Sequence, residues 1–150
     1  MGINKFKKHN ILSNCLKSGL NGIEKQDKKN YIKLKSGKIK RNILGSINLD
    51  HCYEKISPNE NRWDYIIFLN IADYVPCQCI EIHCARSDAV SLIEKKLKWL
   101  KDLIISLNGN IKKDYCFIWV ATDRIHIPKG THYYRKLQTF GIKLMKEFKI

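Results

Sequence analysis

The sequence predicts an α/β fold with a mixed sheet, in which an antiparallel hairpin is followed by a crossover helix and a parallel strand. Residues 63–69 and 77–85 are rich in aromatic and β-branched residues, and they flank a segment with the turn residues Asn, Asp and Pro. Residues 88–107 carry apolar side chains three and four positions apart, which is typical of an amphipathic helix. Residues 115–122 are almost continuously apolar, as expected for an interior parallel strand joined through a right-handed crossover.

The hairpin has a register that the sequence predicts. Its turn is centred near Ala72 and Asp73, because the turn residues lie around them. Counting outward along antiparallel strands then gives three facing pairs. These pairs are Phe68 with Cys77, Ile66 with Cys79, and Asp64 with Glu81.

A polar group is expected at the open end of this hairpin. Because side chains alternate between faces, Arg62, Asp64, Glu81 and His83 share one side of an otherwise apolar sheet. Two opposed carboxylates repel each other and are costly to bury without a cation, a proton or basic partners. We therefore expect a functional site here, with the pKa of at least one carboxyl group raised. In the alternative interpretation, Asp64 caps a loop, Glu81 pairs with Arg62 or a lysine, and His83 is structural.

The length of 150 residues fits one domain. Within it we expect a basic N-terminal region at 1–41, a core at 46–122 and a C-terminal extension at 123–150. Residues 4–17 predict a short helix, and the sequence YIKLKSGKIKR at 31–41 is compatible with a small basic hairpin.

Short elements are also expected around the core. Ser46 or Asn48 can cap a short helix that carries Asp50 and Glu54. After the core, a short strand is expected at 125–127 and a helix at 131–140, and residues 142–150 predict an edge strand or a short helix.

The net charge of +14 favours a polyanionic partner, with nucleic acid ahead of an anionic membrane surface and DNA ahead of RNA. Residues 1–41 contain twelve basic and two acidic residues, so either a phosphate-binding arm or a solvated basic region is expected there. High Ile and Asn usage with little Ala indicates an AT-rich genome, which accounts for part of the lysine content. A homodimer is compatible with the sequence. The candidate nucleic-acid-binding residues are Lys33, Lys35, Lys38, Lys40, Arg41, Arg62 and Lys98.

The six cysteines are expected to be reduced thiols of a cytoplasmic protein, because the N-terminus has no secretory segment and no apolar run could span a bilayer. Cys77, Cys79, His83 and Cys84 resemble a zinc ligand set in composition. On an extended strand, however, Cys77 and His83 lie roughly 20 Å apart, so no zinc is expected. Cys77 and Cys79 are instead expected beneath the crossover helix.

The element order and these acidic residues resemble the PD-(D/E)XK nuclease superfamily, also called restriction-endonuclease-like. In that family an Asp begins one strand, the next strand carries Glu-x-Lys, and a further acid often comes from the preceding helix. Asp64 and Glu81 match the first two positions, and Asp50 or Glu54 is the candidate helical acid. His83 stands where the family has lysine, and Trp63 occupies the place of the proline. The resemblance covers residues 46–122.

The resemblance implies a metal-dependent endonuclease that hydrolyses phosphodiester bonds. Mg²⁺ or Mn²⁺ would be bound by Asp64, Glu81 and Asp50. His83 would act as a base or ligand, and a lysine from the crossover helix, Lys96 or Lys98, would replace the missing cation of the motif. The alternative is an inactive nuclease fold that serves as a binding or regulatory protein, for example one associated with phage or with defence.

Overall fold

A five-stranded mixed sheet forms the centre of the computed structural model, which describes residues 2–35 and 37–150. The strand order is β2-β3-β4-β5-β6. β3 runs antiparallel to both β2 and β4, whereas β4, β5 and β6 run parallel to one another. The strands are β2 (Ile43–Asn48), β3 (Tyr65–Leu69), β4 (Cys77–His83), β5 (Tyr115–Ala121) and β6 (Ile142–Met145).

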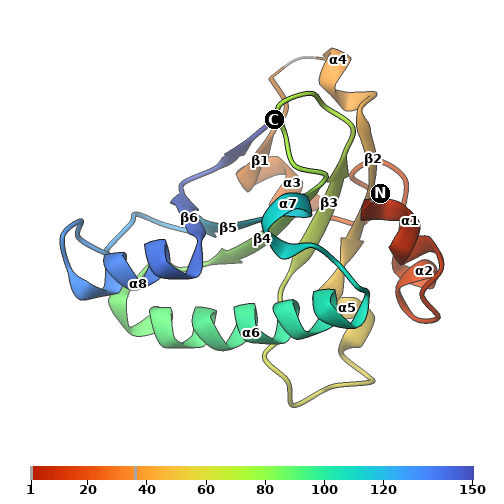
Figure 1. The fold of residues 1–150 in the computed structure, drawn as a ribbon. Coiled ribbons are helices and arrows are strands. Elements are labelled where there is room, and N and C mark those ends of the chain that lie inside the picture. Colours follow the sequence, from red (N-terminus) through yellow and green to blue (C-terminus); the bar gives the residue numbers. More distant parts are fainter. Residues whose placement is uncertain (1, 36) are drawn as a thin grey trace.

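Helices lie along one face of this sheet, and a smaller layer covers the other (Figure 1). α6 (Val90–Ser106), preceded by the short 3-10 helix η1 (Ser87–Ala89), and α8 (His132–Phe140) lie on the first face. α3 (Lys25–Tyr31) lies on the second face together with a two-stranded parallel sheet. The remaining elements are β1 (Ile32–Lys33), β7 (Phe148–Lys149), α1 (Gly2–Lys7), α2 (Leu12–Cys15), α4 (Gly37–Lys40), α5 (Leu49–Tyr53) and α7 (Ile111–Asp114).

The hairpin register agrees with the prediction. Ile66 pairs with Cys79 and Phe68 with Cys77 in the β3–β4 ladder. The ladder ends at Tyr65 and Ile80, one position before Asp64 and Glu81 would face each other. Cys77 and Cys79 are buried in the core cluster between the sheet and α6, as the sequence predicts.

The crossover helix also forms as predicted. α6 buries an apolar stripe because side chains three and four positions apart lie on one side of a helix. Its buried members are Val90, Ile93, Leu97, Leu100 and Ile104. β5 then returns parallel to β4 in an interior position.

Capping residues fix the ends of two shorter helices. The Asn48 side chain accepts a hydrogen bond from the His51 N–H at the start of α5, so Asn48 rather than Ser46 is the cap. Thr131 caps α8 in the same way, and Gly141 ends that helix in the left-handed conformation with φ of 75°. β6 then forms the predicted edge strand.

The N-terminal region departs from the prediction in two places. The helix expected at 4–17 is interrupted between α1 and α2, because the His9 ring accepts hydrogen bonds from the N–H groups of Ile11 and Leu12 at 3.2 Å. The basic hairpin expected at 31–41 does not form either. β1 pairs instead with β7 from the other end of the chain, which buries Ile32 and Phe148.

Two other segments differ from the expectation. Residues 43–48, for which no strand was predicted, form the edge strand β2, because they hydrogen-bond to β3 and bury Ile43 and Ile47. The strand expected at 125–127 is reduced to one bridge between Arg86 and His126.

No helix within the described residues is both long enough and apolar enough to cross a bilayer.

The buried stripe of α6 gives a test of the fold. Leu97→Ala and Leu100→Ala are each expected to lower the free energy of unfolding by about 2–5 kcal/mol, because truncation leaves a cavity against the sheet. Ile105→Ala on the same helix is the control, since Ile105 is exposed; we expect it to lie within about 0.5 kcal/mol of the parent. Urea unfolding curves measure all three. Equal effects at positions 97, 100 and 105 would contradict the packing of α6.

Candidate functional site

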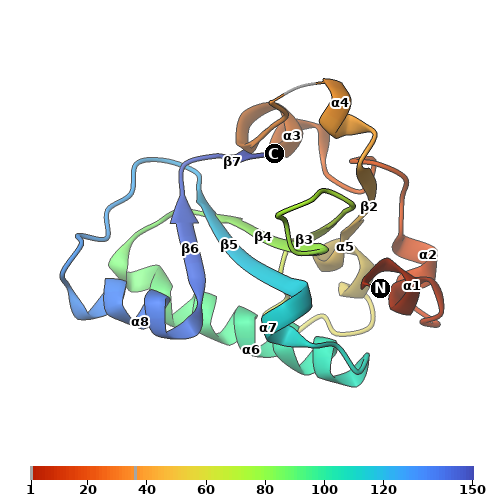
Figure 2. The same cartoon turned by 45° about the horizontal axis from the view of Figure 1, so that its top comes forward.

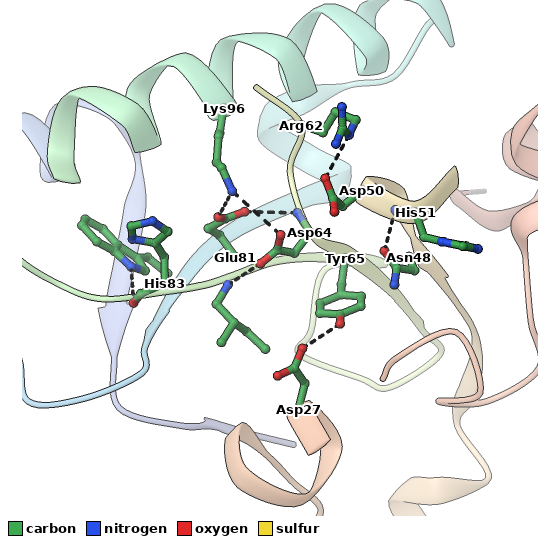
Figure 3. Close-up of polar contacts among 12 residues, drawn as sticks. Asp27, Asn48, Asp50, His51, Arg62, Asp64, Tyr65, Glu81, His83 and Lys96 are labelled. Atoms are coloured by element: carbon green, nitrogen blue, oxygen red, sulfur yellow. Dashed lines mark hydrogen bonds and ion pairs between the residues drawn. The ribbon is translucent and has the colours of Figure 1, made fainter. Parts of the chain in front are cut away.

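Asp64, Glu81 and Lys96 form a buried polar cluster at the open end of the β3–β4 hairpin. Asp64 directly precedes β3, Glu81 lies on β4, and Lys96 reaches down from α6 to both carboxylates (Figure 3). The Lys96 ammonium donates a hydrogen bond to Glu81 Oε1 and lies 3.9 Å from Asp64 Oδ1. The Glu81 side chain is fully buried, whereas those of Lys96 and Asp64 are 17% and 22% exposed.

Each carboxylate also binds the backbone of the opposite strand. The Asp64 N–H donates to Glu81 Oε2 at 3.1 Å, and the Ile82 N–H donates to Asp64 Oδ2 at 2.9 Å. These two bonds continue the strand pairing beyond the last ladder residues. Asp64 and Glu81 therefore lie close together as the sequence predicts, and the side chain of each accepts a hydrogen bond from the backbone of the other strand.

Burial dominates the electrostatics of the two carboxyl groups. It raises the pKa of Glu81 to about 8, with further repulsion from Asp64 and opposition from Lys96. Burial also raises the pKa of Asp64 to about 6, although Lys96 and the Ile82 N–H act against it. For Lys96, burial would lower the pKa, but attraction to Glu81 and Asp64 outweighs burial and raises it. The Lys96 ammonium therefore stays protonated, and its positive charge is attracted to both carboxyl groups.

An acidic cavity of about 230 Å³ opens beside Asp64. Asp50 on α5 lines it, and the Arg62 Nε donates to Asp50 Oδ1 at 2.9 Å. Glu54 also lines it and pairs with the His51 ring at 3.1 Å, so both acids that the sequence offered from the preceding helix border this cavity. The lining residues are Glu24, Asp27, Asn48, Asp50, His51, Glu54, Asp64 and Tyr65.

Asp27 and Tyr65 belong to this cavity although the sequence gave no sign of it. The Tyr65 hydroxyl donates a hydrogen bond of 2.7 Å to Asp27 Oδ2, and burial together with this bond raises the pKa of Tyr65. Asp27 lies on α3, far from β3 in the sequence and on the other face of the sheet. No local pattern around residues 24–27 distinguishes them from a solvated basic helix.

His83 lies apart from the carboxylates. Its ring Nδ1 is 3.0 Å from the Cys84 carbonyl oxygen, and its centroid lies 6.5 Å from that of Trp119. The His83 carbonyl accepts a hydrogen bond from the Trp119 indole at 3.0 Å, so the residue is tied to β5 (Figure 3). Lys96, rather than His83, contacts Glu81 and Asp64.

The candidate nucleic-acid-binding residues are not gathered at this cluster. Lys33, Lys35, Lys40 and Arg41 are exposed near β1 and α4, on the side of the molecule away from α6 (Figure 2). Lys98 is exposed and pairs with Asp102, and Arg62 is mostly buried against Asp50 and the Ser57 carbonyl. The Lys38 side chain lies outside the part that the structure describes.

The expectation that all six cysteines are reduced was wrong. Cys15 on α2 and Cys52 on α5 form a disulfide, because folding brings their Cα atoms to 6.0 Å. Nothing in the spacing of 37 residues indicated this pair. The free thiols are Cys77, Cys79, Cys84 and Cys116.

The donor atoms do not form a ready-made metal cage. Within residues 2–35 and 37–150, no three His, Cys, Asp or Glu side chains are grouped so that they could hold an ion on their own. Mg²⁺, however, is commonly bound through one or two carboxylates, with water and substrate phosphate as the other ligands. Asp50 and Asp64, which border one polar cavity, have the chemistry that this mode of binding requires.

Comparison of the chain with protein-family models, with curated proteins and with solved structures gives no match.

The raised pKa of Glu81 makes a pH-dependent contribution to stability. The group binds a proton more tightly in the folded state, with a pKa of about 8, than in the unfolded state, where glutamate has a pKa of about 4.3. The folded state therefore holds more protons between these values, and its stability must fall as pH rises through this range. We expect Glu81→Gln to gain stability relative to the wild type between pH 5 and pH 9.

Urea unfolding at about pH 5, 7 and 9 checks this expectation. The substitution itself can change the free energy of unfolding by a constant amount. This constant does not affect how the difference in unfolding free energy between variant and wild type changes with pH. Asp102→Asn is the control, because Asp102 is exposed on α6 and should leave the difference flat. A flat difference for Glu81→Gln would mean that Glu81 titrates normally.

Proposed function

We propose that this protein is a divalent-metal-dependent nuclease built on a PD-(D/E)XK-like core. The observation that carries the proposal is the contact of Lys96 with Glu81 and its approach to Asp64. The cluster has the residue types of that family: an Asp before one strand, a Glu on the next strand and a lysine beside both. The lysine comes from α6 and not from position 83 of β4, where this chain has His83. The order of two antiparallel strands, a helix and a parallel strand supports the same reading.

The metal would lie on the cavity side of the cluster. Asp64 and Asp50 would hold Mg²⁺ or Mn²⁺ there, with Glu81 adjoining Asp64 and with water and phosphate oxygens as further ligands. A bound ion of this kind polarises a phosphodiester and lowers the pKa of a coordinated water. It would also favour the ionised form of Asp64, whose pKa is raised by burial.

Lys96 has two roles in this proposal. Its charge keeps Glu81 from being an isolated buried carboxylate, and its ammonium is partly exposed and can offer a donor to an approaching phosphate oxygen. Arg62 fixes the orientation of Asp50 through its hydrogen bond to Oδ1, while Ser57 holds the other end of the guanidinium through a carbonyl contact of 2.7 Å. The Ile82 N–H orients Asp64 in the same manner.

A second candidate function is a nucleic-acid-binding protein without catalysis. Both Glu81 oxygens already have partners within the protein, Lys96 and the Asp64 N–H. In addition, His83 is tied to its own strand and to Trp119 rather than to the carboxylates. On this alternative, the cluster is a structural joint between α6 and the hairpin, and only the exposed basic residues contact nucleic acid.

Plasmid nicking distinguishes the two functions. We expect nicking that requires Mg²⁺ or Mn²⁺, and a loss of about 10²-fold or more in Asp64→Asn and in Lys96→Ala, because the first removes a metal ligand and the second removes a cation beside the reacting phosphate. Lys95→Ala is the matched control, since Lys95 is the exposed neighbour on α6 and should retain full activity. The same ions should raise the melting temperature of the wild type but not of Asp64→Asn. Absence of both nicking and metal stabilisation would leave the binding-only function.

Nucleic-acid binding is tested separately through its salt dependence. If Lys33, Lys35, Lys40 and Arg41 contact phosphates, affinity for duplex DNA should fall steeply with salt, and replacing all four by Gln should reduce the slope of log K against log salt by about 3 to 4. Lys112→Gln with Lys113→Gln, on α7, is the control for a general loss of charge. Binding that is undetectable even at low ionic strength would contradict any nucleic-acid function.

A further inference from the structure

The Cys15–Cys52 disulfide is joined directly to the element that carries Asp50. Cys52 lies on α5 two residues after Asp50, and Cys15 is the last residue of α2. α5 has five residues and α2 has four, and helices of this length have little stability of their own. Their positions therefore depend on what holds them to the rest of the protein.

Non-covalent contacts hold mainly one side of α5. The Leu49 N–H donates to the Asp64 carbonyl at 2.8 Å, and the Leu49 side chain is buried. Tyr53 packs edge-to-face against Trp99 of α6 at 5.4 Å. Asp50 and His51 instead face the acidic cavity, and Asp50 is about half exposed. Asp50 is held there by the Arg62 hydrogen bond, and Asn48 caps the His51 N–H. The disulfide lies on the buried side of α5 with Leu49 and Tyr53, where it ties the helix covalently to α2.

The disulfide is placed where its redox state can change. Both of its cysteines are partly exposed, whereas the free thiols Cys77 and Cys79 are fully buried in the core. Burial also raises the pKa of those two thiols, which keeps them in their unreactive form. Cys77 and Cys79 therefore do not exchange with the disulfide, and a reducing agent acts on the one bond beside α5.

We propose that the Cys15–Cys52 disulfide is a redox-controlled clamp that holds Asp50 in the metal-binding position. This inference rests on the proposed function, because it concerns the same metal site. The oxidised form keeps α5 against α2 and presents Asp50 beside Asp64. The reduced form releases α5, so that Asp50 spends less time at the cavity and the metal binds less tightly.

The chemical step is a thiol–disulfide exchange with a cellular dithiol. One thiolate of the dithiol attacks a sulfur of the disulfide, forming a mixed disulfide and releasing the other cysteine as a thiolate. The second thiol of the dithiol then displaces the remaining cysteine. The dithiol is oxidised to a disulfide, and two electrons and two protons pass to Cys15 and Cys52.

Two measurements on the full-length protein test the clamp. The oxidised protein and protein reduced with dithiothreitol, with the reagent removed under anaerobic conditions, are compared by amide hydrogen exchange and by calorimetric titration with Mn²⁺. On reduction we expect faster exchange in residues 49–54 with unchanged exchange in β4 and β5, and Mn²⁺ affinity weaker by about fivefold or more, as is typical of coupled sites. Cys52→Ser should behave like the reduced protein under both conditions.

A cysteine variant far from α5 serves as the control, and two results would contradict the clamp. Cys116→Ser removes a free thiol on the other face of the sheet and should keep the full response to reduction. Unchanged exchange in residues 49–54 overturns the clamp, whatever the metal result. Faster exchange with equal Mn²⁺ affinity overturns its control of the site. If the oxidised protein does not bind Mn²⁺ at all, the proposed metal site fails and redox control of metal binding fails with it, while the exchange result separately shows whether α5 is released.

Discussion

The contact of Lys96 with Glu81 is the constraint on which the packing of α6 against the sheet depends. Glu81 is fully buried, so a charge there without a partner would be strongly destabilising. Lys96 lies three residues from Ile93 and four from Leu100, at the border of the buried stripe of α6. The rotation that buries this stripe also places the ammonium over Glu81. Helix packing and the candidate site are therefore fixed by the same arrangement.

Burying these charged groups between α6 and the sheet costs free energy of folding. Replacing a buried ion pair by apolar residues of similar volume is often neutral or stabilising, so the cluster does not follow from the needs of the fold. The raised pKa values of Asp64 and Glu81 measure the same cost, because burial is the largest cause of both. Strongly raised pKa values beside a polar cavity are found more often at functional sites than elsewhere, although structural ion pairs also produce them. The energetics thus favour a role in binding or catalysis over a purely structural joint.

The parts of the fold that follow from short-range patterns could be predicted from the sequence. Alternation in the two central strands and a turn near Asp73 were enough to set the register, and that register brought Asp64 to Glu81. The apolar spacing of residues 90–104 gave both the helix and its buried face. Lysine at position 96 was recognisable as a candidate because it borders that face, whereas its choice over Lys98 depends on helix rotation.

What could not be predicted depends on contacts between distant parts of the chain. β1 pairs with β7, so Ile32 is buried against the C-terminus instead of forming a local basic hairpin. Cys15 meets Cys52, and Asp27 meets Tyr65, only after α2 and α3 have packed around the sheet. In each case a reasonable local interpretation was displaced by a tertiary contact that leaves no periodic trace in the sequence.

The distribution of charge separates the two candidate functions more sharply than the net charge does. The protein carries +14, but five carboxylates border the cavity beside the cluster, whereas the exposed basic residues lie near β1 and α4, on the side of the molecule away from α6. These basic residues, rather than the cavity, would attract a polyanion. At the cavity itself, a phosphate would meet a local excess of negative charge, which repels it at close range.

A divalent cation bound between Asp50 and Asp64 would reduce that local repulsion and give the phosphate a positive charge to contact. On the proposed nuclease function, hydrolysis at this site would therefore need the metal for the approach of the substrate as well as for the chemistry. A protein that only binds nucleic acid has no such requirement, because its basic residues act without the cavity. On the proposed nuclease function, dependence on a divalent ion would follow from where this chain places its acids and its lysines, and this dependence would distinguish the two functions.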